Sequence, residues 1–440
     1  MAQLKFILLS LIGLFLFMIP IPYDDSTSVP VAVLAGMFED QLGDTITAVA
    51  MVIIIISALM SIIAKLFPER FHKESYLGSV FNVSGFWLLV RIVGMIFIIF
   101  TYYQIGWEGI YSSDTGGMIL TSLMPALVAV FLVASYLLPL LLNYGLLEFI
   151  GSLFSKIMRP VFKLPGRSTV DNLASWLGDG TIGVLLTSRQ YEEGYYSKRE
   201  AAVIGTTFSV VSITFTITVV DYVNLMHMFL PLYLTIVVAG LAAAIIMPRI
   251  PPLSRIPDTY YTDEPKSHDE TTPEGYNVVT WGYKKATERA KQSPNVFGFV
   301  KEGTKNAMDM WFGVLPVVMA IGTLGVIIAE KTIFFDIIGA PFVPLLELMQ
   351  VPEAQEAAKT ILVGFTDMFL PAIMISGVEH EITRFIVAAL SITQLIYLSE
   401  VGGVLLASKV PVNFWRLVVI FLLRTLITLP IIILMAHLIF

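Results

Sequence analysis

Two short polar segments interrupt apolar runs of this chain, and they contain the side chains best suited to bind a solute. The first is Gly178-Asp179-Gly180-Thr181, inside the run of residues 170–186, and the second is Gly364-Phe365-Thr366-Asp367. A carboxylate at membrane depth costs several kcal/mol, and glycines there give up helical hydrogen bonds that lipid cannot replace. Such breaks persist beside protein-lined polar cavities, and a pair of them indicates a transporter's binding site.

The side chains at these two tips have two alternative roles. A structural cap would use Asp179 to accept backbone N–H groups of the half-helix that follows. In a binding role, carboxylates and hydroxyls bond to the hydroxyl or amine groups of a solute. We expect Asp179, Gly180 and Thr181 to bind solute together with Thr366 and Asp367, and capping does not exclude this role.

The span after each broken run contains polar residues at matched positions. Counted from the arginine that precedes each span, Ser209 matches Gln394, and Ser212 matches Tyr397. Hydroxyls in membrane helices more often bond to their own helix or join it to a neighbour. A deep amide in the paired position favours ligand binding, so all four residues belong to the predicted site.

Glu400 and Arg424 form a second candidate group. Glu400 precedes Lys409 by nine residues, and Arg424 follows Arg416 by eight. At about 1.5 Å per residue, the two therefore lie at similar depths in the membrane. The simpler interpretation is a buried ion pair, and the alternative is proton or sodium coupling through Glu400. Arg91 also needs a partner, which the sequence does not identify.

The composition is that of a polytopic membrane protein. Of the 440 residues, 56% are hydrophobic and 14% are charged, which is too apolar for a soluble domain of this length. The net charge of -7 and the lack of a basic patch argue against nucleic acid as a partner. Cysteine is absent, which excludes disulfides and thiolate ligands. No metal or cofactor is expected, because the five histidines are far apart: His72, His227, His268, His380 and His437.

The apolar runs predict nine full spans, since a spanning helix needs about 20 apolar residues. They cover residues 6–21, 47–67, 86–103, 118–142, 201–222, 228–247, 311–329, 385–406 and 414–435. Basic connections around Arg70, Arg159 and Arg249 predict the cytoplasmic side, and residues 23–44 and 104–114, which are acidic, predict the other side. The N-terminus is then cytoplasmic and the C-terminus periplasmic.

Two broken runs, residues 168–187 and 355–376, are predicted to be re-entrant hairpins that enter from opposite faces of the membrane. Near the first of them, Asp171 and Glu148 are expected close to the inner surface, solvated or capping. The order of glycine, proline, carboxylate and arginine repeats around both hairpins, so we predict an all-α membrane protein with an inverted repeat. Its segments are 1–110, three N-terminal helices; 115–249, the first repeat; 250–309, a cytoplasmic linker with an amphipathic helix at 278–291; and 310–440, the second repeat.

At these motifs the chain resembles the YjiH family of bacterial inner-membrane proteins, which carry a nucleoside-recognition Gate domain. The matching segments are MRPVFKLPGR (158–167), WLGDGTIG (176–183) and YEEGYYSKRE (191–200), and the likeness extends over nearly the whole chain. More distantly, the chain is similar to the concentrative nucleoside transporters. The resemblance implies an inverted-hairpin architecture, a transport role and the bacterial inner membrane as location.

We therefore interpret the chain as a secondary-active transporter of a small polar solute, working by alternating access and driven by a proton or sodium gradient. In the nucleoside transporters that the chain resembles, Gln and Glu at the first tip hold the nucleobase and ribose, and this chain has Asp179 and Thr181 in their places. The Asn-Glu of their second tip is replaced here by Thr366-Asp367. Nucleoside-like solutes, nucleobases, dipeptides and organic acids all stay open as substrates.

Two other function classes stay open beside transport. One is an accessory membrane subunit that needs a partner protein. The other is a membrane enzyme, which we do not expect, because the sequence has no nucleophile elbow, metal-ligand pair or phosphate-binding glycine loop. A homo-oligomer and a complex with a second Gate-domain subunit are both open as assemblies.

Overall fold

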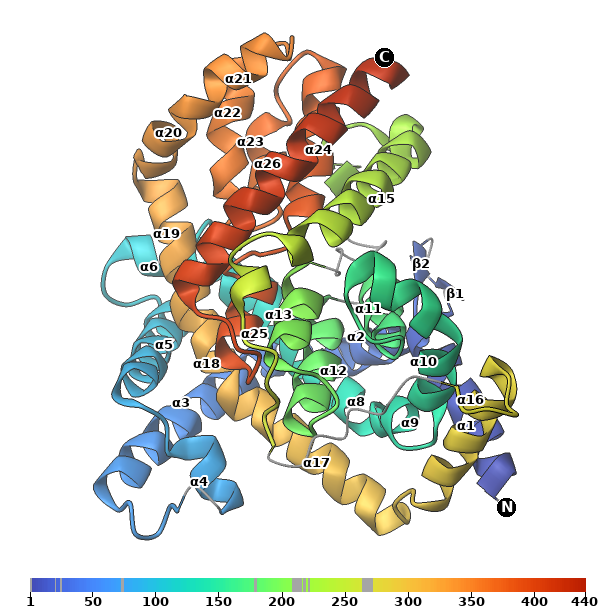
Figure 1. The fold of residues 1–440 in the computed structure, drawn as a ribbon. Coiled ribbons are helices and arrows are strands. Elements are labelled where there is room, and N and C mark those ends of the chain that lie inside the picture. Colours follow the sequence, from blue (N-terminus) through green and yellow to red (C-terminus); the bar gives the residue numbers. More distant parts are fainter. Residues whose placement is uncertain are drawn as a thin grey trace.

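The described part of the chain folds mainly into helices, as a computed structural model shows (Figure 1). The structure describes residues 2–19, 21–23, 26–72, 75–177, 180–207, 216, 219–220, 222–262 and 272–440. Within these residues, six helical stretches are long and apolar enough to cross a membrane: Thr45–Leu66, Gly85–Tyr103, Glu108–Leu142, Met226–Arg255, Val296–Lys331 and Phe414–Ile439. The predicted class of helical membrane protein is therefore confirmed.

These six stretches coincide with six of the nine predicted spans. The first predicted span, residues 6–21, corresponds to a shorter apolar helix, Ala2–Phe17. The predicted span 201–222 lies partly outside the described residues. The span 385–406 is not one continuous helix, and this difference matters for the candidate site described below.

The N-terminal part supplies helices and one small β-hairpin. Its elements are α1 (Ala2–Met18), β1 (Ile21–Tyr23), β2 (Ser26–Ser28), α2 (Pro30–Leu42), α3 (Thr45–Leu66), α4 (Tyr76–Phe81) and α5 (Gly85–Tyr103). β1 and β2 pair antiparallel. Pro30 starts α2 at a position where its missing N–H costs no helical hydrogen bond. α2 and α3 pack on α8 (Met124–Leu137), and α3 also packs on α17 (Val296–Gly313), so this part is joined closely to the rest of the chain.

The first repeat contains the first helical hairpin. Its elements are α6 (Glu108–Tyr111), α7 (Gly116–Met118), η1 (Ile119–Leu123), α8 (Met124–Leu137), α9 (Pro139–Leu142), α10 (Leu146–Ile157), η2 (Met158–Phe162), α11 (Ser168–Leu177), α12 (Gly180–Glu192), α13 (Lys198–Thr207), η3 (Met226–Met228), α15 (Phe229–Ile246) and η4 (Met247–Arg249). α11 and α12 pack against each other. Gly183 permits this close approach, because a Cβ there would lie 2.7 Å from the Cβ of Ser175. The predicted break of the run 168–187 is therefore present as two packed helices.

The connection between the repeats contains η5 (Leu253–Arg255) and α16 (Val278–Lys291). The amphipathic helix is confirmed with the predicted bounds. It begins with a capping box, in which Asn277 accepts the backbone N–H of Thr280 and the Thr280 side chain accepts that of Asn277. Its small buried residues, Ala286 and Ala290 among them, lie toward the protein, and α16 packs on α10 and α1.

The segment predicted as the second repeat contains a second pair of packed helices, α22 and α23. Its elements are α17 (Val296–Gly313), α18 (Leu315–Val317), η6 (Val318–Gly322), α19 (Thr323–Lys331), α20 (Phe334–Gly339), η7 (Ala340–Phe342), α21 (Val343–Leu348), α22 (Ala354–Val363), α23 (Leu370–Ile375), α24 (Glu381–Gln394), α25 (Val401–Ala407) and α26 (Phe414–Ile439). Its first helix begins at Val296, well before the predicted span at 311–329, because Asn295 caps it by accepting the N–H of Gly298.

Both repeats place a π-turn in their first long helix. η1 ends two residues before Pro125, and η6 begins two residues after Pro316. The two π-turns contact each other. Proline removes a helical hydrogen bond, and a π-turn is one of the ways in which a helix accommodates that loss. Each half thus contains a π-turn in its first long helix, and the two irregular segments meet in the fold.

Buried side chains of both repeats form one continuous hydrophobic core. In the second half, α24 and α26 pack together with α15 of the first repeat, and the three helices lie side by side in Figure 1. The two chain ends lie at opposite ends of the molecule in the same view (Figure 1). The two halves of the chain therefore pack against each other through shared buried side chains.

Candidate solute-binding site

The tip of the second hairpin, residues 364–369, joins α22 to α23 and is organised by Asp367. One oxygen of Asp367 accepts the backbone N–H groups of Phe369 at 2.7 Å and Leu370 at 3.2 Å. The other oxygen accepts the hydroxyl of Ser399 at 2.8 Å. Thr366 is buried and donates its hydroxyl to the Val363 carbonyl at 2.8 Å. Asp367 therefore caps α23 and also ties the tip to another segment.

That other segment is an unwound stretch, residues 395–400, between α24 and α25. The sequence predicts a continuous span over 385–406, and this prediction is wrong. Leu395 has a φ of 63°, and the backbone then leaves the helix and pairs with the hairpin tip. Leu398 donates its N–H to the Phe365 carbonyl at 2.8 Å, and Ser399 donates to the Thr366 carbonyl at 3.0 Å. These bonds replace helical ones, so the break leaves those backbone groups satisfied inside the protein.

Gln394, just before the unwound stretch, and Tyr397, within it, both form hydrogen bonds with neighbouring protein groups. The Gln394 amide donates to the Ile361 carbonyl at 2.7 Å and to the Thr425 hydroxyl at 3.0 Å. The Tyr397 hydroxyl lies 3.1 Å from the carbonyl of residue 392. Both side chains are almost fully buried. In this conformation they are bound to the protein itself, and their predicted contact with solute stays a prediction.

The first hairpin contacts the same break. Gly180, the first residue of α12, packs against Val401, the first residue of α25, so that a Cβ on Gly180 would lie 3.0 Å from the Val401 side chain. Thr181 is buried beside it. Gly180 thus contacts Val401, and Thr366 and Asp367 bond to Ser399, two residues earlier in the chain. Three other predicted site residues lie outside the described residues: Asp179, Ser209 and Ser212.

Arg424 is fully buried in α26 and connects the two repeats. Its guanidinium donates to the carbonyls of Thr207, at the described end of α13, and Thr393, near the end of α24. A cation at the end of a helix satisfies carbonyls that have no intrahelical partner. Glu400 stands at the start of α25, and both Glu400 and Arg424 act electrostatically on Tyr397. The predicted Glu400–Arg424 ion pair stays a prediction.

A buried polar cluster at the base of the first hairpin differs from expectation. Asp171 is 1% exposed and accepts from Gln190 at 2.5 Å and from Thr187 at 3.2 Å. The guanidinium of Arg167 lies 3.6 Å from the ring centroid of Tyr195 and 3.9 Å from the carboxylate of Glu148. The expectation that Asp171 and Glu148 are solvated is therefore wrong, because the packing of α10, α11 and α12 encloses them.

Two residues of the site were not singled out from the sequence. Ser399 donates a hydrogen bond to the Asp367 carboxylate, and the Thr425 hydroxyl accepts one from the Gln394 amide. The available signal for Ser399 is its position in Ser399-Glu400, shortly before Gly402 and Gly403, since polar residues and paired glycines are unusual within an apolar span. In the part of the chain that the structure describes, no group of three or more His, Asp or Glu side chains is placed to hold a metal ion.

The chain is similar to several known proteins. A family model described as Gate, nucleoside recognition, matches residues 124–226, which contain the first hairpin. A double variant of CNTnw in an outward-facing state is 15% identical, with 97% of this chain and 99% of that chain covered and a TM-score of 0.42. CNTnw in an inward-facing substrate-bound state is 13% identical, with 92% and 98% covered and a TM-score of 0.33.

A much stronger match is to a curated protein. The uncharacterized protein BpOF4_10220 of Alkalihalophilus pseudofirmus is 48% identical over 439 residues, covering 100% of this chain and 95% of that protein. An identity this high over the full length indicates common descent. The chain therefore belongs to the same protein family as BpOF4_10220, and it contains a Gate nucleoside-recognition segment that includes the first hairpin.

Proposed function

We propose that this protein is a secondary-active transporter that moves a small polar solute across the bacterial inner membrane. The observation that carries the proposal is the meeting of three helix breaks. The second hairpin tip bonds to the unwound residues 395–400 through Ser399, and Gly180 of the first hairpin contacts Val401 at the end of that stretch. Helix breaks that meet within a membrane supply polar groups to a bound solute or ion.

Asp367 is the group best suited to the solute or to the driving cation. An ionised carboxylate has about four acceptor positions. Asp367 uses three of them, for the N–H groups of Phe369 and Leu370 and the hydroxyl of Ser399, and its side chain is only half-buried. The remaining position can accept an N–H or O–H of a solute, or bind sodium or a proton. This residue therefore carries the coupling role in the proposal.

Alternating access requires the two repeats to move relative to each other. The paired π-turns and the two helical hairpins support an inverted repeat. The charge pattern of the sequence predicts that the hairpins enter from opposite faces. The predicted topology puts the N-terminus in the cytoplasm and the C-terminus in the periplasm. The Gate match supports nucleoside-type solutes as the first class to test, followed by nucleobases, dipeptides and organic acids.

The proposal is tested with the purified full chain in liposomes. Uptake of each radiolabelled solute class is measured with an inward sodium gradient, with a pH gradient, and with neither. We expect accumulation of one class under one gradient, lost in Asp367→Asn and kept in Asp336→Asn, which alters an exposed carboxylate of α20. If no class accumulates under any gradient, the chain alone is not a transporter, and uptake that appears only with an added partner protein would favour the accessory role.

A further inference from the structure

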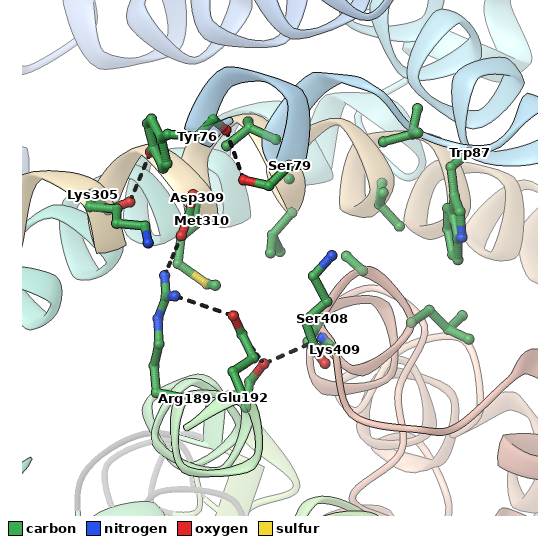
Figure 2. Close-up of a pocket in the computed structure, with 18 of the residues that line it drawn as sticks. Tyr76, Ser79, Trp87, Arg189, Glu192, Lys305, Asp309, Met310, Ser408 and Lys409 are labelled. Atoms are coloured by element: carbon green, nitrogen blue, oxygen red, sulfur yellow. Dashed lines mark hydrogen bonds and ion pairs between the residues drawn. The ribbon is translucent and has the colours of Figure 1, made fainter. Parts of the chain in front are cut away.

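A cavity of about 710 Å³ lies apart from the hairpin tips, where the N-terminal part meets both repeats. Its walls come from α4, α5, α12, α17 and the end of α25. In Figure 2, Tyr76, Ser79 and Lys305 face Arg189, Glu192 and Lys409 across the opening. The basic connections near Arg70 and Lys409 place this side toward the cytoplasm in the predicted topology.

The charged side chains that line the cavity are mostly cationic. The four cations are Arg91, Arg189, Lys305 and Lys409, and the two carboxylates are Glu192 and Asp309. The lining thus has an excess of two positive charges. Both carboxylates are already paired with one cation, because Arg189 lies 2.6 Å from Asp309 and 3.5 Å from Glu192. Three cations are left without a carboxylate partner among the described residues.

Arg91 is the most unusual of these three. It is 5% exposed, and its guanidinium donates to the hydroxyl of Ser61 at 2.7 Å. No carboxylate oxygen of the described part of the chain lies within 4.0 Å of it. A buried charge normally has a partner of opposite charge, because removing it from water is costly. Ser61 is neutral, so the compensating charge has to come from elsewhere.

We propose that this cavity binds a small soluble anion, whose carboxylate or phosphate group lies against Arg91. A guanidinium forms paired, charge-assisted hydrogen bonds with both groups. Lys409 and Lys305 add positive charge at the opening, and Ser79 and Ser408 add hydroxyls. The site is separate from the hairpin tips, and it binds an anion whether or not the protein transports its solute by the route proposed above.

Equilibrium binding to the full-length protein in detergent tests this site. Inorganic phosphate and succinate are titrated at constant ionic strength against chloride, and binding is followed by calorimetry and by tryptophan fluorescence, because Trp87 lines the cavity. We expect saturable binding of at least one of the two anions. Arg91→Gln should weaken it about tenfold or more, since it removes a charge-assisted contact. Lys409→Gln should weaken it by a smaller factor.

Lys331→Gln is the matched control, because Lys331 is an exposed cation of α19 that does not line the cavity. It should bind as the wild type does. If Arg91→Gln does not fold, Arg91→Lys and Lys409→Gln give the same comparison. The proposal is overturned if neither anion binds, if the cavity variants bind like the control, or if an anionic lipid in mixed micelles binds at Arg91 and succinate does not displace it.

Discussion

The Asp367 carboxylate accepts a 2.8 Å hydrogen bond from the hydroxyl of Ser399, a residue 32 positions further along the chain. The same carboxylate accepts the N–H groups that start α23. Capping a half-helix and forming the centre of a polar site are therefore two properties of one residue. The negative charge of Asp367 and its hydrogen bonds can therefore be tested independently with different substitutions.

Replacement of Asp367 by Asn should leave the protein folded but abolish ligand binding or uptake. Asn keeps an oxygen that can accept the N–H groups of Phe369 and Leu370, while it removes the charge. We expect a small loss of stability, about 1 kcal/mol or less, and loss of ligand-induced stabilisation or uptake. Melting temperature and ligand affinity are measured on the same preparation. Wild-type affinity in Asp367→Asn would remove this tip from the site.

Asp367→Ala is the complementary variant. It removes both the cap and the bond to Ser399, so we expect an additional loss of about 0.5–2 kcal/mol from the cap alone. Asp179→Asn and Thr181→Val extend the test to the first tip, with Thr181→Val weakening binding by about 0.5–3 kcal/mol. Should the Asp367→Ala protein bind ligand normally once folded, the residue would be a structural cap and nothing more.

Gly364 and Gln394 should be energetically coupled. A Cβ on Gly364 would lie 2.0 Å from the Gln394 amide oxygen, so Gly364→Ala displaces the amide from its bonds to Ile361 and Thr425. Losing buried hydrogen bonds costs about 1–3 kcal/mol. Because Gln394→Ala removes the obstacle, the double variant should lose less than the sum of the two single losses. Chemical unfolding of the four proteins gives the coupling, and strictly additive losses would contradict it.

Any substitution of Arg424 that shortens the side chain should lower the stability of the protein. Its guanidinium joins the carbonyls of Thr207 and Thr393, and a single ammonium cannot reproduce that fork. Arg424→Gln should lose about 3–5 kcal/mol of stability, and Arg424→Lys should recover only a minor part.

Adding Glu400→Gln to Arg424→Gln tests the predicted ion pair. Recovery of stability in this double variant supports the pair, and additive losses show that the two side chains do not interact.

The topology can be tested directly, because the chain has no cysteine. Lys163 and Glu379 are both exposed, whereas Arg189 is buried in its ion pairs and is a poor labelling site. A membrane-impermeant thiol reagent should label Lys163→Cys from the cytoplasmic side and Glu379→Cys from the periplasmic side. Labelling of both variants from one side would rule out opposed hairpins.

Composition and local pattern were enough to predict the helical elements. Apolar runs of sufficient length have few alternatives in a membrane, so six predicted spans coincide with long apolar helical stretches, although three of these stretches extend well beyond the predicted bounds. The helix at Val278–Lys291 has the predicted bounds. The two broken runs were also detectable, because glycine and a carboxylate are incompatible with an uninterrupted lipid-facing helix.

Only the tertiary structure decided how the breaks are satisfied. The unwinding of residues 395–400 depends on backbone partners at Phe365 and Thr366, which no local pattern in the span itself encodes. For the same reason, the partners of Arg424 and the exposure of Arg91 to a cavity could not be read from spacing. A hydropathy pattern shows which polar groups are costly to place in the membrane. The partners of these groups come from segments that are distant in the sequence and close in the fold, so the pattern does not identify them.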